Sequence, residues 1–101
     1  MEVESWFVGE EHHYSNVHAS LNHSHASSEV GFDIRAATTE TIVQPSKILD
    51  RVYQKVGFAY KKRHSQVERT VNAIDYANLY INVRVRNSSL HQFLSLLEAA
   101  I

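Results

Sequence analysis

The sequence contains no cysteine, and this absence removes several chemistries together. Without thiols there is no disulfide, no thiolate nucleophile, no iron–sulfur ligand and no cysteine-based zinc site. The three glycines are scattered singly, so a glycine-rich phosphate loop is also missing, as is a Gly-x-Ser-x-Gly nucleophile elbow. A histidine paired with Asp33 or Asp75 is the one catalytic arrangement left open. We therefore expect a protein that is not an enzyme and that needs no cofactor.

Long apolar runs are missing as well. No segment approaches the roughly 18 apolar residues of a membrane-spanning helix, and the opening MEVESWFVGEEHH lacks the basic and apolar regions of a secretory signal. These features predict a cytoplasmic protein. The chain has 101 residues, of which 44% are hydrophobic and 21% charged, which predicts a single domain over residues 1–101.

Alternating apolar residues predict β-strands in the first part of the chain and again near residue 80. The segments 3–8, 16–27 and 29–43 are rich in β-branched, aromatic or alternating residues, and we expect two or three antiparallel strands from them. In the segment 77–87 every second residue is apolar, which is typical of a half-buried strand. Its apolar members are Ala77, Leu79, Ile81, Val83 and Val85.

A helix is predicted to begin near residue 46, because Pro45 fits the first helical turn and Ser46 can cap it. Its apolar residues follow a helical stripe that runs far enough to allow one helix to about residue 74. The alternative is a helix that ends near Arg63 and a strand over 66–73. The sequence favours neither of these two interpretations.

The last segment, 88–101, predicts a second helix with Ser88 or Ser89 as its cap. Strands, helix, strand or strands, and helix together predict an α+β fold. We expect a mostly antiparallel sheet with two helices packed on one face, specifically a ferredoxin-like βαββα core with an N-terminal β-hairpin.

Charge is distributed unevenly although the formal net charge is only −1. Residues 1–45 hold seven acids against Arg35 alone, while residues 46–101 hold nine bases against four acids. Three interpretations follow: a basic surface for nucleic acid, head-to-tail assembly, or attraction between the two halves within one molecule.

Five of the seven histidines lie between His12 and Ala26. On a strand, His23 and His25 would point to the same face, as two ligands of one zinc or nickel ion must. They are the candidate metal ligands, with a third ligand needed from a neighbouring strand or from another copy. Hydrogen-bonded or solvated histidines on a strand are the commoner outcome of such a pattern.

A basic run supplies the candidate anion-binding residues. Phosphate binding favours clustered lysine and arginine beside aromatic rings, and a late strand would add an outward ladder of arginines next to a tyrosine. The candidate residues are Lys61, Lys62, Arg63, Tyr80, Arg84 and Arg86.

The function expected from these features is binding or assembly. We expect a small protein, most often a homodimer or higher oligomer, that regulates, inhibits or scaffolds a protein partner. The second hypothesis is a nucleic-acid or nucleotide-binding protein that uses the basic residues, and the third is a histidine-rich metal-binding protein. No membrane partner is expected.

Overall fold

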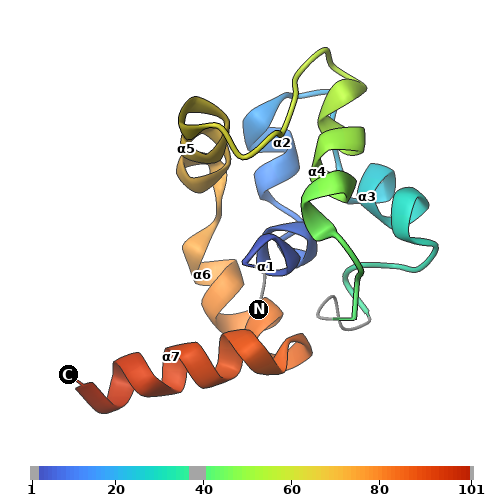
Figure 1. Cartoon of the computed structure of the whole chain (residues 1–101). Coiled ribbons are helices and arrows are strands. Elements are labelled where there is room, and N and C mark those ends of the chain that lie inside the picture. The colour runs from blue at the N-terminus through green and yellow to red at the C-terminus, as the bar shows by residue number, and fades with distance from the viewer. Residues whose placement is uncertain (1–2, 37–40, 101) are drawn as a thin grey trace.

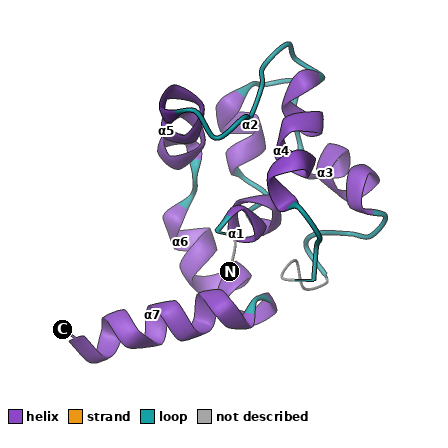
Figure 2. Ribbon diagram, viewed as in Figure 1, coloured by secondary structure: helices purple, strands orange, loops and turns teal. Residues whose placement is uncertain are grey.

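The computed structural model describes residues 3–36 and 41–100, and every regular element in these ranges is a helix (Figure 2). In chain order the elements are α1 (Glu4–Gly9), α2 (His13–Val17), α3 (His23–Val30), α4 (Pro45–Gln54), α5 (His64–Ala73), α6 (Tyr76–Asn78), the π-helix η1 (Leu79–Val83), the 3-10 helix η2 (Arg84–Arg86) and α7 (Ser88–Ala100).

The predicted α+β fold is therefore wrong. None of the described residues forms a strand, so this part of the chain contains neither the antiparallel sheet nor the ferredoxin-like core with its hairpin. Residues 37–40, which belong to the strand predicted over 29–43, lie outside the described residues. The physical reasons differ from one segment to the next.

The segment predicted as the first strand is the central helix α1. Figure 1 shows it in the middle of the molecule, with α4 above it and α7 below. All six of its residues are buried, including the neighbouring Trp6 and Phe7. A strand would place such neighbours on opposite faces, but a short helix surrounded by other elements is buried on every side, and its polar Glu4 and Ser5 are buried with hydrogen-bond partners.

The alternation of Val30, Phe32 and Ile34 arises from a helix end. Val30 is the last residue of α3, and Gly31 follows it in the left-handed conformation with φ of 86°. Glycine adopts this conformation without the penalty of a Cβ atom, so it commonly ends helices. The chain then turns back, and Ile34 enters the core while its N–H donates to Ser27 Oγ at 3.1 Å.

The predicted helix start at Pro45 is confirmed, because α4 begins there and buries one stripe of side chains. The helix ends at Gln54, and Gly57, with φ of 80°, lies in the turn that follows. Residues 64–73 are helical, but they form the separate helix α5 rather than a continuation of α4. The strand alternative for this segment is wrong.

The strand predicted over 77–87 is instead a helical segment made mainly of α6, η1 and η2. Leu79 and Val83 are buried, whereas Ile81 and Val85 are 63% and 79% exposed. Burial therefore repeats every four residues, as on a helix, although apolar residues occur at every second position. Asp75 starts this segment, since its carboxylate accepts the Asn78 N–H at 3.1 Å.

The final helix is confirmed as α7, but its predicted cap is displaced by one residue. The side chain of Asn87, rather than Ser88 or Ser89, accepts the Leu90 N–H, at 3.1 Å. In Figure 1, α7 runs along one edge of the molecule, and its C-terminal half extends beyond the other helices.

Candidate functional site

The start of α7 is fixed to the buried helix α1. Asn87 Nδ2 donates to Ser5 Oγ at 3.2 Å, and Trp6 Nε1 donates to Ser89 Oγ at 3.0 Å. The ring of Phe93 packs against Trp6 with 5.3 Å between the centroids. These contacts hold the first two turns of α7 firmly against the body of the protein.

The second half of α7 is held by one polar edge. Arg84 Nη2 lies 2.6 Å from Glu98 Oε1 and also donates to Ser95 Oγ at 3.1 Å. Arg84 Nε donates to His91 Nδ1 at 3.0 Å, and Tyr80 donates to the same Glu98 carboxylate. The hydrogen bonds from Arg84 and then from Tyr80 lower the pKa of Glu98 to about 2. We call these groups the Arg84–Glu98 clamp.

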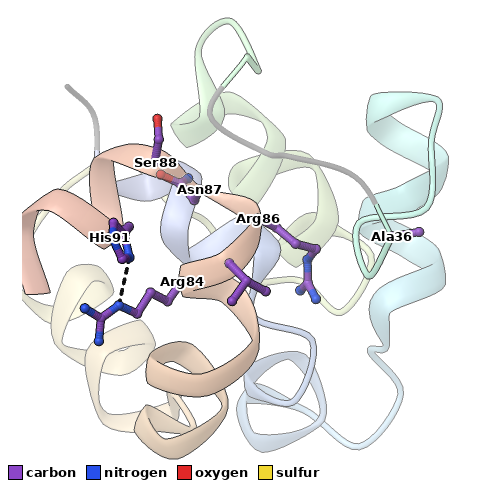
Figure 3. Close-up of a pocket in the computed structure, with 7 residues that line it drawn as sticks. Ala36, Arg84, Arg86, Asn87, Ser88 and His91 are labelled. Carbon is purple, nitrogen blue, oxygen red and sulfur yellow. Dashed lines mark hydrogen bonds between the residues drawn. The ribbon is translucent and has the colours of Figure 1, made fainter.

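A cavity of about 630 Å³ opens beside this clamp, between η2, the start of α7 and the turn at Ala36 (Figure 3). Among the lining residues that the structure describes there are two arginines and a histidine but no acidic residue. The lining residues are Ala36, Arg84, Val85, Arg86, Asn87, Ser88 and His91. In Figure 3 the side chain of Arg84 is joined to His91, while Arg86 extends from the other side of the helix.

Arg86 is bonded far less completely than Arg84. Its Nη2 donates to the Gly9 carbonyl at 3.2 Å, and its buried Nε has no hydrogen-bond partner within the described residues. No carboxylate in this part of the chain forms an ion pair with it. The cavity is therefore lined by a partly buried guanidinium that no described carboxylate neutralises.

The opposite edge of α7 is apolar and exposed. Phe93, Leu96 and Leu97 are 42%, 73% and 46% exposed. On a helical projection these side chains share one side with Ala100, away from the edge that Arg84 holds. The edge carries no charged residue, which is unusual for the exposed side of a helix.

The structure brings together only some of the predicted anion-binding residues. Tyr80 and Arg84 lie four residues apart on one helical face, with the guanidinium 5.0 Å from the ring centroid, and both bind Glu98. Arg86 faces elsewhere, because residues two apart on a helix point about 200° apart. The outward arginine ladder that depended on a strand is therefore wrong.

Lys61, Lys62 and Arg63 lie in the separate loop between α4 and α5 (Figure 1). Lys61 Nζ lies 2.7 Å from Asp50 Oδ2, and Lys62 Nζ lies 3.5 Å from Glu4 Oε1. Burial raises the pKa of Asp50, but the hydrogen bonds from Lys61 and from the Tyr60 N–H outweigh it and lower the pKa overall. These two lysines balance acids of the same molecule.

His23 and His25 lie on helix α3 rather than on a strand, so their side chains diverge. His25 Nδ1 lies 3.4 Å from the Asn22 N–H and helps to cap the helix, while His23 lines a different pocket with Asp33. Within residues 3–36 and 41–100, no group of three or more histidines and carboxylates could hold a metal ion.

A buried polar network is the feature that sequence reasoning missed. The fully buried carboxylate of Glu10 accepts hydrogen bonds from Asn78 Nδ2 at 2.5 Å and from the Asp75 N–H at 3.0 Å. In the sequence Glu10 stands in GEEHH, which resembles an exposed turn. The His12 N–H also donates to this carboxylate, at 2.8 Å, but nothing local indicates that its other two partners, Asp75 and Asn78, lie more than sixty residues away.

Comparison with known proteins gives no relative: no family model, curated protein or solved structure matches the chain. In the described ranges, no helix has both the length and the apolar character needed to cross a bilayer. The residues themselves must therefore carry the functional assignment.

Proposed function

We propose that this chain is a small binding and assembly protein, rather than an enzyme, and that it pairs with a second copy of itself through the apolar edge of α7. The exposure of Leu96 at 73%, in the centre of an edge without charges, is the observation that carries the proposal. Exposed apolar patches of this kind commonly mark protein interfaces.

A second copy fits this edge in the antiparallel orientation. About the twofold axis of such a pair, Leu96 of one copy lies across from Leu97 of the other. Phe93 of one copy then faces Ala100 of the other, and the small alanine side chain leaves room for the phenylalanine ring. The antiparallel arrangement also sets the macrodipoles of the two α7 helices in opposite directions, which avoids placing like helix ends side by side.

In such a dimer, the two copies are joined through their α7 helices alone. This arrangement suits the regulation or scaffolding of a further protein, because each body keeps its remaining surface free for contact. The overall charge of −1 does not oppose association, since two nearly neutral chains repel each other weakly.

Sedimentation velocity over a range of protein concentrations tests the pairing. We expect the wild-type chain to form a dimer and the Leu96→Glu variant to weaken it by about 100-fold, or about 2.7 kcal/mol, because two carboxylates would then be buried near the axis. The matched control is Val43→Glu, since Val43 is 82% exposed but lies between α3 and α4. A wild-type chain that stays monomeric at all concentrations contradicts the proposal.

A further inference from the structure

The cavity at η2 and the start of α7 holds positive charge that the described part of the protein does not neutralise. Arg84 is committed to Glu98, but within residues 3–36 and 41–100 Arg86 has the Gly9 carbonyl as its one hydrogen-bond partner. A cation that is partly removed from water and lacks a counter-ion gains from an anionic ligand. We propose that this cavity binds the phosphoryl group of a small phosphorylated molecule.

The amount of charge favours a phosphoryl group over a carboxylate. Arg86 contributes one positive charge, and the N-terminal end of the 13-residue α7 adds roughly half a charge. A phosphate monoester carries about −1.5 to −2 at neutral pH, which matches this total better than the single charge of a carboxylate. None of the lining residues that the structure describes is acidic, so none of them repels such a ligand.

The neighbouring side chains supply further donors in fixed positions. His91 Nδ1 accepts a hydrogen bond from Arg84 Nε, so the neutral ring carries its proton on Nε2 and can donate from there. Arg84 is itself held by Glu98 and Ser95, so this arrangement does not have to form when the ligand binds.

The size of the cavity leaves room for a ligand larger than inorganic phosphate. A volume of about 630 Å³ falls within the roughly 300–1,000 Å³ of small-molecule sites. Val85 and Ala36 give the lining an apolar part against which an organic group can pack. A nucleoside monophosphate has both the charge and the size.

Chemical-shift titration of the full chain in phosphate-free buffer tests the site, with inorganic phosphate, adenosine monophosphate and acetate as the three probes. We expect both phosphate probes to shift the amide signals of residues 85–91 saturably and acetate to bind far more weakly. If inorganic phosphate and adenosine monophosphate bind with equal affinity, the cavity recognises the phosphoryl group alone. If the nucleotide binds more tightly, the apolar lining contributes to binding as well.

Two variants lower the positive charge of the cavity in different ways. Arg86→Gln keeps a donor for the Gly9 carbonyl but loses the charge, and Val85→Glu places an acid at an exposed rim position without changing the core. Each should weaken phosphate binding by about tenfold or more, whereas Arg63→Gln, an exposed arginine elsewhere, should leave it unchanged. The proposal is overturned if neither phosphate probe saturates, if acetate binds as tightly, or if both cavity variants bind like the wild type.

Discussion

His13 is a fully buried histidine whose two ring nitrogens have opposite roles. Nδ1 lies 2.6 Å from the Glu10 carbonyl, so it donates, and Nε2 accepts from the Tyr53 hydroxyl at 3.0 Å. That hydroxyl in turn accepts from Thr70 Oγ at 2.9 Å. A second proton on His13 would disrupt this chain, and burial lowers its pKa from 6.5 to about 4.

The protein should therefore lose stability in mild acid. Between pH 6.5 and about 4, the unfolded chain takes up a proton on His13 that the folded chain refuses, so the free energy of unfolding falls by about 3 kcal/mol as the pH drops. Urea unfolding at several pH values measures this slope. The His13→Gln variant should show a flatter slope over this range.

The neighbouring His12 gives a control of opposite sign. Its Nδ1 lies 2.8 Å from Asp75 Oδ2, and the hydrogen bond to Asp75 raises its pKa. His12 therefore stabilises the folded state at low pH and loses this contribution as the pH rises through the raised pKa. Because this contribution changes only above pH 6.5, the His12→Gln variant should lose stability between pH 6.5 and 4 with the same slope as the wild type, and should differ from it in slope only above pH 6.5. Equal slopes in both histidine variants would contradict these assignments.

Among the elements, the second half of α7 should depend on the Arg84–Glu98 clamp. We expect Glu98→Gln to speed hydrogen exchange at the amides of residues 96–100 and to leave those of α1 unchanged, because α1 lies in the core. Glu68→Gln on α5 is the matched control, since Glu68 is likewise a helix glutamate in an ion pair, with His64 Nε2 at 3.2 Å, but lies on another helix. Exchange in α7 that is equally slow in both variants would show that the clamp does not hold the helix.

The clamp should also persist in acid. Because the pKa of Glu98 is lowered to about 2, its contribution is present above its ordinary pKa and is lost only as the pH falls through the folded value. Hydrogen exchange in α7 at pH 4 should therefore still distinguish the wild type from Glu98→Gln.

The elements also show what the sequence could and could not predict. The starts of α4 and α7 were predictable because Pro45 and a polar residue before an apolar stripe act locally. The helical structure of 77–87 was not predictable, because exposed Ile81 and Val85 alternate with buried Leu79 and Val83 and give the sequence the period of a strand. Only the partners of the segment, such as Glu10 with Asn78, show which apolar residues face the core.

The same limit applies to the candidate site. Arg84 and Tyr80 were predictable as residues of one face, since a spacing of four puts them on the same face of a helix and of a strand alike, although only the helix brings them close together. The separation of Arg86 from Arg84 was not predictable, because it depends on which of these two structures forms. The Arg84–Glu98 clamp joins residues fourteen apart and required the turn at Asn87.

For the whole molecule, the uneven charge of the sequence is balanced partly within the fold. Lys62 of the basic half lies 3.5 Å from Glu4, and Lys55 lies 3.7 Å from Glu29, both of the acidic half. This is the third of the three interpretations, attraction between the two halves. The apolar edge of α7 is the feature of the described surface that such pairing leaves unexplained.

Self-association through that edge should make thermal stability depend on protein concentration. Because the dimer is favoured by mass action, each tenfold increase in concentration should stabilise the folded chain by about 0.7 kcal/mol, which raises the melting temperature by about 3–5 °C. Differential scanning calorimetry of the wild type and of Val43→Glu should show this rise. Leu96→Glu should melt at one temperature throughout, equal to that of the dilute wild type, because Leu96 is 73% exposed in a single copy and its loss costs that copy little. If the melting temperature of the wild type does not change with protein concentration, the chain does not form a dimer through the apolar edge of α7.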